Sequence, residues 1–277
     1  GSRAFAVGLP DWREYMPETQ LKRFWYNVSR WSQARKGELY PPGADICNSG
    51  AKLGTPIPRP ELVIRNGMER GSKEWTLQLY GAALYWHLAS TPGESIADVD
   101  TELLRGKAVL EVGCMRGGGA RYLAEVAGPS EYLATDESAE NVELCRRSHG
   151  ESSPANLRFQ CIPPSRLAEH CSAESFDFVL CVEAAAQLET DAFSELLRGA
   201  GIVLRRGGRL ALCDAFEPGR LRELEEGLAA AGLVEEVRSD LGKWVRAAGL
   251  SPVPIGESGS LTGVAPVTYL RIVARKA

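Results

Sequence analysis

The chain is most constrained by a regular alternation of short apolar runs with helical patterns, which begins at residue 107 and continues to its end. Patterns typical of helices fall at residues 118–127, 139–148, 191–204 and 220–231. The runs that are typical of strands are residues 107–112, 132–135, 157–162, 176–182, 209–214, 233–238 and 269–275. Such alternation favours a parallel sheet with helices on both faces.

The connection between the last two predicted strands differs from the others. It is interrupted by prolines and glycines between residues 252 and 266. A parallel pair needs a long crossover, usually a helix, so the last strand is expected to be antiparallel. The predicted fold is therefore α/β, with a Rossmann-like, seven-stranded and mostly parallel sheet.

Residues 1–74 differ in character and are expected to form an aromatic-rich N-terminal helical cap, separate from a domain at 75–277. The aromatic residues of this segment include Trp12, Tyr15, Phe24, Trp25, Tyr26, Trp31 and Tyr40. Aromatic clusters are ordinary core material, so an extension packed on the domain is one interpretation. A lid over an apolar substrate at the carboxyl edge of the sheet is the other.

Composition excludes several classes of function. A net charge of -4 and a pI near 5.6 disfavour a nucleic-acid partner. No apolar run is long enough to span a bilayer, and a cytoplasmic location is expected. The cysteines form no C-x-x-C pair, and no His and carboxylate cluster has the spacing of metal ligands, so neither disulfides nor a metal site is predicted.

A glycine-rich turn, EVGCMRGGG at residues 111–119, follows the first predicted strand and precedes a helix. Glycine lets the backbone approach a ligand closely, and the helix N-terminus supplies N–H donors. Asp136 ends the next strand, where a carboxylate can accept hydrogen bonds from both ribose hydroxyls. This context predicts a cofactor that contains a nucleoside.

Several segments of the chain resemble the class I S-adenosylmethionine-dependent methyltransferases. They are ELLRGKAVLEVGCMRGGGARYLAE, EYLATDESAENVELCRRSH, FDFVLCVEAA, GGRLALCDAF and the upstream helix TLQLYGAALYWHLAS. More narrowly, they are similar to the branch that methylates lipid or polyketide hydroxyls, such as the phthiotriolone and natural-product O-methyltransferases. The resemblance covers residues 75–277 and implies S-adenosylmethionine as cofactor. It also implies a small apolar, natural-product-like acceptor that is methylated on a hydroxyl or on carbon.

The resemblance also implies roles for individual residues. Glu111 and the backbone of Gly113 would hold the methionine end of the cofactor, and Asp136 would hold the ribose. Residues 161–163 would border the adenine, and residues 181–183 would line the floor near the sulfonium. The predicted cofactor set is Tyr80, Glu111, Gly113, Cys114, Met115, Gly117, Asp136, Glu137, Ile162, Cys181 and Val182. Tyr80 would reach the cofactor carboxylate, although a core tyrosine on a helix face fits its position equally well.

The chain departs from the pattern of this family at three positions. Met115 replaces the central glycine of E-x-G-x-G-x-G, so its side chain is expected to crowd the cofactor unless the turn shifts. The acidic residue that often follows the third strand is absent, because the sequence there is CIPP. The histidine expected shortly after Glu183 is also missing, since the sequence continues AAAQ.

The missing histidine leaves His87 and Glu183 as the candidate catalytic residues. His87 lies on the helix that leads toward the cofactor, and an ordinary imidazole pKa suits a proton acceptor near neutrality. A structural histidine on an amphipathic helix is the alternative. Glu183 would either accept a proton or orient the sulfonium. Alignment of an in-line attack can also supply most of the rate, so a base is not obligatory.

Two rival functions remain at the level of sequence. A cofactor-binding homologue that has lost catalysis and serves as a scaffold is compatible with Met115 and the missing histidine. A nicotinamide oxidoreductase is disfavoured because the spacing departs from G-x-G-x-x-G and no Y-x-x-x-K pair is present. The expected partner is an apolar or aromatic small molecule, and formation of a homodimer is left open.

Overall fold

The computed structural model describes residues 45–277 except 47, 49, 55, 65–67, 150–152, 187 and 250–266. The chain divides into two compact units, Gly1–Tyr40 and Pro41–Ala277. The domain boundary expected after residue 74 stays a prediction. The first unit lies outside the described residues, so the aromatic-rich cap stays a prediction.

The second unit alternates helices and strands as the sequence predicted. Its longer helices are α2 (Lys73–Ser90), α3 (Gly118–Val126), α4 (Ala139–His149), α6 (Thr190–Val203), α7 (Pro218–Ala230) and α8 (Gly242–Ala248). Shorter helical turns are η2 (Pro60–Leu62), η4 (Pro164–Arg166) and α5 (Leu167–His170). The strands are β1 (Ala108–Val112), β2 (Glu131–Asp136), β3 (Leu157–Cys161), β4 (Phe176–Val182), β5 (Leu204–Phe216), β6 (Leu233–Asp240) and β7 (Thr268–Lys276).

The strands form one seven-stranded sheet in the order β3-β2-β1-β4-β5-β7-β6. The first five strands along the chain pair in parallel. Strand β7 lies between β5 and β6 and is antiparallel to both. The predicted Rossmann-like α/β fold with an antiparallel last strand is confirmed.

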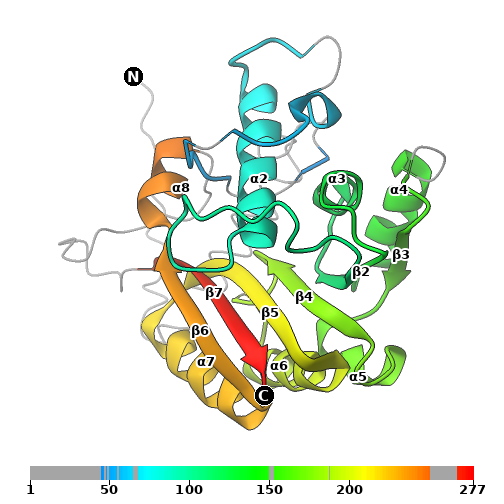
Figure 1. Ribbon diagram of the computed structural model, residues 1–277, viewed down its shortest axis with the longest axis vertical. Coiled ribbons are helices and arrows are strands. Elements are labelled where there is room, and N and C mark those ends of the chain that lie inside the picture. The colour runs from blue at the N-terminus through cyan, green and yellow to red at the C-terminus, as the bar shows by residue number, and fades with distance from the viewer. Residues whose placement is uncertain are drawn as a thin grey trace, which may run out of the picture. The chain divides into compact units, whose positions relative to one another are not determined.

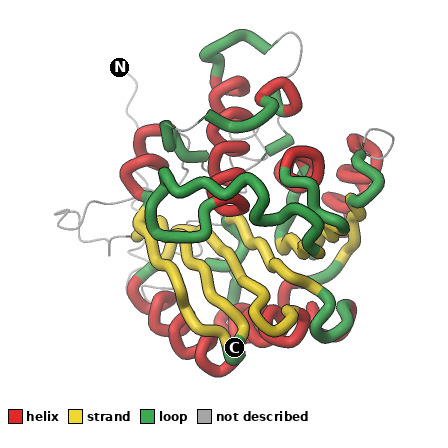
Figure 2. Tube along the Cα trace, viewed as in Figure 1, coloured by secondary structure: helices red, strands yellow, loops and turns green. Residues whose placement is uncertain are grey.

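Helices cover both faces of this sheet, as Figures 1 and 2 show. Helices α2, α3 and α4 contribute Leu84, Leu123 and Val142 to the apolar core on one face. Helices α6 and α7 contribute residues such as Leu197 and Leu224 to the core on the other face. All five residues of β1 are buried, as expected for a strand that is covered on both sides.

Two details of the fold were not predicted. Helix α8, Gly242–Ala248, has only seven residues, which is too few for a clear helical period. Strand β5 begins at Leu204, directly after α6, and is thirteen residues long. Its first part was not predicted, because Arg205, Arg206 and the two glycines that follow are not typical of a strand.

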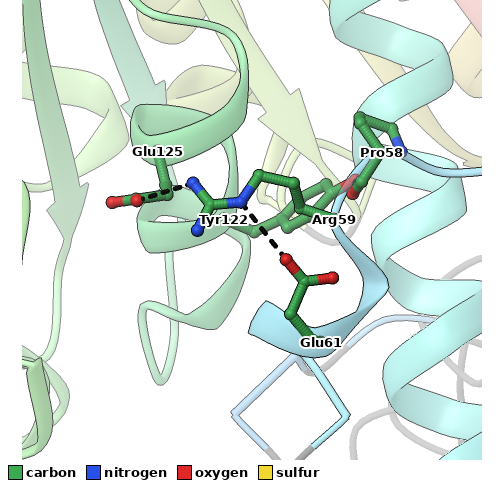
Figure 3. A network of polar contacts seen from close by, with 5 residues as sticks. All are labelled: Pro58, Arg59, Glu61, Tyr122 and Glu125. Atoms are coloured by element: carbon green, nitrogen blue, oxygen red, sulfur yellow. Dashed lines mark hydrogen bonds and ion pairs between the residues drawn. The ribbon is translucent and has the colours of Figure 1, made fainter.

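The described residues before α2 pack against α2 and α3. The Asn48 side chain donates to the carbonyl of Gly81 on α2, at 3.2 Å. The Tyr122 hydroxyl on α3 donates to the Pro58 carbonyl at 2.8 Å. Figure 3 shows these two residues beside Arg59, which is paired with Glu61 and Glu125. Within the described part of the chain, every helix is too short or too polar to cross a lipid bilayer.

Candidate functional site

The predicted site lies where β1, β2 and β4 end at the same edge of the sheet. Gly113 follows β1 with φ +81°, in the left-handed region that favours glycine. A Cβ built on Gly113 would lie 2.2 Å from the Cβ of Ala184, in the loop after β4. Glycine is therefore required at position 113 for its backbone angle and for the close approach of the neighbouring loop.

Met115 adopts a left-handed backbone conformation, which favours glycine. Its φ is +46°, which costs a side-chain-bearing residue about 1–2 kcal/mol. Two hydrogen bonds hold this conformation. The backbone N–H of Met115 donates to Oδ2 of Asp136 at 2.9 Å, and the Cys145 thiol donates to its carbonyl at 3.1 Å. The turn therefore keeps a glycine-like path, and the expected crowding of the cofactor by the Met115 side chain stays a prediction.

Asp136, at the end of β2, links the turn to the elements around it. It is 6% exposed. Its Oδ1 accepts from the Ser138 backbone and from the Asn141 side chain, both at 3.0 Å. The carbonyl of Asp136 accepts from the backbone of Ile162 at 3.0 Å. The predicted ribose residue thus lies beside the residue predicted to border the adenine.

Glu137 follows Asp136, and its carbonyl accepts a hydrogen bond from the Cys161 thiol at 3.4 Å. Cys114 and Gly117 lie in the glycine turn itself, where the Gly117 N–H donates to the carbonyl of Cys114 at 2.8 Å. The structure thus brings together the predicted residues of the turn and of the edges of β2 and β3.

Glu111 is fully buried at the end of β1, and both of its carboxylate oxygens are bound by tyrosines. Tyr85 donates to Oε1 at 2.8 Å and Tyr132 donates to Oε2 at 2.6 Å. Burial raises the pKa of Glu111 to about 7, although the two hydroxyl donors oppose that rise. Glu111 therefore anchors the strand end from within, and its direct contact with the cofactor stays a prediction.

Tyr85 was not singled out from the sequence. Its ring lies over the start of α3, because a Cβ built on Gly119 would lie 2.1 Å from the Tyr85 ring. Burial and Glu111 raise the pKa of the Tyr85 hydroxyl well above its ordinary value, so it stays a donor. The predicted neighbour on α2, Tyr80, is half-buried and accepts a backbone hydrogen bond from Ala51 at 3.0 Å. Its role toward the cofactor carboxylate stays a prediction.

A small cleft opens beside the start of α3. Its lining includes Gln78, Gly118 and Arg121. The Gln78 amide nitrogen is buried and has no hydrogen-bond partner among the described residues. The cleft therefore lies between α2, α3 and the described residues before α2, and it includes none of the strand ends.

His87 is buried near the end of α2, at 3% exposure. Its Nδ1 lies 2.9 Å from the Thr91 hydroxyl. Burial, and to a smaller extent Arg271, lower the pKa of His87 to about 3. The imidazole therefore stays neutral near pH 7, and no described hydrogen bond links its side chain to the glycine turn or to Glu183.

The edge of β4 and β5 carries two buried acids, Glu183 and Asp214. Tyr269 on β7 donates to Oε1 of Glu183 at 2.7 Å. Oδ2 of Asp214 accepts from the backbones of Ala185 at 3.0 Å and Ala186 at 2.8 Å. Burial, and next the charge of Glu183, raise the pKa of Asp214 to about 6.

Of the other predicted floor residues, Cys181 is 0% exposed and Val182 is 5% exposed, both within β4. Asp214 ends a predicted strand, a signal that could have found it, but it was not among the predicted site residues. Tyr269 carried no local signal, because 86 residues separate it from Glu183.

A glycine turn after β1, an acid at the end of β2 and further acids after β4 and at the end of β5 define a site for a nucleoside-containing cofactor. Residues 109–208 match the model of the family described as methyltransferase domain. The chain is 36% identical over 137 residues to a probable phthiotriol/phenolphthiotriol dimycocerosates methyltransferase 2 of Mycobacterium ulcerans (strain Agy99), covering 47% of this chain and 48% of that protein. It is 35% identical over 163 residues to a fatty-acid O-methyltransferase of Mycolicibacterium smegmatis, covering 57% and 51%.

The chain spans about half the length of these curated relatives. A crystal structure of geranyl diphosphate C-methyltransferase from Streptomyces coelicolor A3(2), in complex with Mg²⁺, geranyl diphosphate and S-adenosyl-L-homocysteine, shares the fold. Its TM-score is 0.59 at 15% identity, over 85% of this chain and 92% of that one. Residues 109–208 are therefore similar in sequence to methyltransferase domains, and the fold is shared with a methyltransferase that was crystallised with S-adenosyl-L-homocysteine.

The residues present fit S-adenosylmethionine. Gly113 leaves no side chain where the turn meets the loop after β4. The Asp136 carboxylate stands at the end of the next strand, where a ribose is held in such sites. Ile162 follows β3 and its N–H donates to the Asp136 carbonyl; its side chain is 0% exposed, and its place beside the adenine stays a prediction.

Proposed function

We propose that this chain transfers the methyl group of S-adenosylmethionine to an oxygen of an apolar, lipid-like acceptor. The observation that carries the proposal is the hydrogen bond between Asp136 and the Met115 backbone, which joins the glycine turn to the end of β2, where the ribose is expected. The acceptor class is taken from the names of the relatives, which act on dimycocerosates and on a fatty acid. We also propose, as expected from the sequence, that the acceptor is a small natural-product-like molecule and that the protein is cytoplasmic.

When bound, S-adenosylmethionine supplies an electrophilic methyl group. Asp136 would accept hydrogen bonds from the ribose hydroxyls, and the backbone of the glycine turn would hold the methionine end. Glu183 would face the acceptor, because the loop that it begins packs against Gly113 through Ala184. There the carboxylate would take the proton from the acceptor hydroxyl, while alignment of the in-line attack would supply much of the rate. His87 is a poor proton acceptor for this step, since it is buried and its pKa is lowered to about 3.

Nothing in the described residues favours the scaffold alternative. Met115 keeps a glycine-like backbone angle, and Glu183 places a carboxylate near the position where a histidine is missing.

Calorimetry with S-adenosylmethionine, followed by transfer assays with palmitate and 1-hexadecanol as probe acceptors, tests the proposal. The wild-type chain should bind the cofactor with a Kd on the order of micromolar. Asp136→Asn should weaken binding by about tenfold to a hundredfold, because a charged acceptor of the ribose hydroxyls is lost. Asp98→Asn, at an exposed aspartate in the loop before β1 that is outside the predicted cofactor set, is the matched control and should leave the Kd within about twofold. Absence of binding at millimolar cofactor would overturn the proposal.

A further inference from the structure

The catalytic candidate Glu183 is held by a side chain from a distant strand. We propose that Tyr269 is a positioning residue, whose hydroxyl fixes the Glu183 carboxylate for its reaction with the methyl acceptor. This inference rests on the proposed function, since it assigns Tyr269 a part in the same reaction.

The backbone of Glu183 is itself constrained. Its φ is +54°, which is uncommon for a residue with a side chain and persists only where the surroundings determine it. Its N–H donates to the Cys213 carbonyl at 2.9 Å. Asp214 holds the next two N–H groups of the loop, those of Ala185 and Ala186. The start of the loop after β4 is thus fixed by β5 before the Glu183 side chain is considered.

Tyr269 then fixes the side chain. It stands opposite Ala215 in the antiparallel ladder of β5 and β7, and it is 1% exposed. Its hydroxyl lies 2.7 Å from Oε1 of Glu183. Burial, and next the charge of Glu183, raise the pKa of this phenol well above its ordinary value, so it donates a hydrogen bond without giving up its proton. These properties suit a positioning group rather than a proton carrier.

Stability alone gives a weak reason for this pair. Glu183 is only 7% exposed, and burying a carboxylate costs free energy that one hydroxyl donor does not fully restore. A phenylalanine would fill the space of Tyr269 without the polar group. Glu111 at the neighbouring edge is held in the same way by Tyr85 and Tyr132, so the chain uses tyrosine donors for both buried glutamates of the site.

The test compares Tyr269→Phe with Tyr122→Phe. Tyr122 is also 1% exposed, and its hydroxyl also makes one hydrogen bond, to the Pro58 carbonyl, away from Glu183. With the better of the two probe acceptors, Tyr269→Phe should lower kcat by about tenfold to a hundredfold, the effect of losing one hydrogen bond to a charged group. The KM for S-adenosylmethionine and the Kd for S-adenosylhomocysteine should change less than about twofold. Tyr122→Phe should leave kcat within about twofold.

A double-mutant cycle with Glu183→Gln completes the experiment. If Tyr269 acts through Glu183, Tyr269→Phe should change kcat by less than about twofold in the Glu183→Gln background. Equal kcat values for Tyr269→Phe and Tyr122→Phe, or additive losses in the cycle, would refute the positioning role while leaving the proposed function intact. A wild-type chain that does not bind S-adenosylmethionine would overturn the proposed function and this inference with it, so the two failures are distinguishable.

Discussion

Replacing Gly113 with alanine should impose two separate penalties on the cofactor turn. The φ of +81° costs an alanine about 1–2 kcal/mol. The new Cβ would lie 2.2 Å from the Cβ of Ala184, and an overlap of this kind costs about 1–3 kcal/mol when the surroundings must shift. Gly113→Ala is therefore expected to lower the free energy of unfolding by about 2–5 kcal/mol.

Gly207→Ala is the matched control. Gly207 has nearly the same backbone angle, φ +76°, but a Cβ built there meets nothing within 4 Å. This variant should lose only the backbone part, about 1–2 kcal/mol. Adding Ala184→Gly to Gly113→Ala removes the second methyl group and should recover most of the difference between the two single variants.

Urea denaturation measures the stability of each variant, and calorimetry measures its Kd for S-adenosylhomocysteine. Gly113→Ala should weaken binding by at least about tenfold, and Gly207→Ala should leave it unchanged. The reasoning is refuted if Gly113→Ala destabilises the chain no more than Gly207→Ala, or if adding Ala184→Gly recovers no stability. In either case the contact between the turn and the loop after β4 does not require glycine at position 113.

Two further predictions concern the same edge of the sheet. Burial raises the pKa of Glu111 from 4.5 to about 7, so folding favours its neutral form. The stabilisation by neutral Glu111 is full below about pH 4.5 and is lost as the pH rises to about 7. Urea denaturation at pH 5 and pH 8 should therefore show that the free energy of unfolding falls by about 2–3 kcal/mol more in the wild type than in Glu111→Gln. Equal falls would contradict the assignment. Met115→Gly relieves the φ of +46° but frees the unfolded chain, so stability should change by less than about 1 kcal/mol. Calorimetry should show S-adenosylhomocysteine bound severalfold more tightly if the Met115 side chain crowds the cofactor, and an unchanged Kd would refute that crowding.

The sequence predicted the central strands β1, β2 and β4 well because they are buried on both faces and therefore appear as nearly continuous apolar runs. The antiparallel last strand followed from the prolines and glycines that precede it. The seven residues of α8 were missed because a short helix has too little periodicity to detect. The early start of β5 was missed because its polar residues and glycines resemble a turn.

The cofactor turn could be predicted because its residues are close in sequence and each follows a strand. The tyrosines that hold Glu111 and Glu183 could not. Tyr85 and Tyr269 reach these acids only through the packing of α2 and the pairing of β7, over 26 and 86 residues. His87 was a candidate proton acceptor because the ordinary pKa of imidazole suits that role. The cost of burying its charged form could be seen only in the folded chain.

The position of β7 between β5 and β6 has a consequence for the order of folding. The glycine turn and Asp136 depend on β1 and β2, which pair over a short separation along the chain. Tyr269 reaches Glu183 only after β7, Thr268–Lys276, has paired with β5 and β6, which both precede it in the sequence. Contacts of long sequence separation form late because the entropy of loop closure must be overcome first. During synthesis on the ribosome, the glycine turn and its hydrogen bond to Asp136 should therefore form before the hydrogen bond between Tyr269 and Glu183.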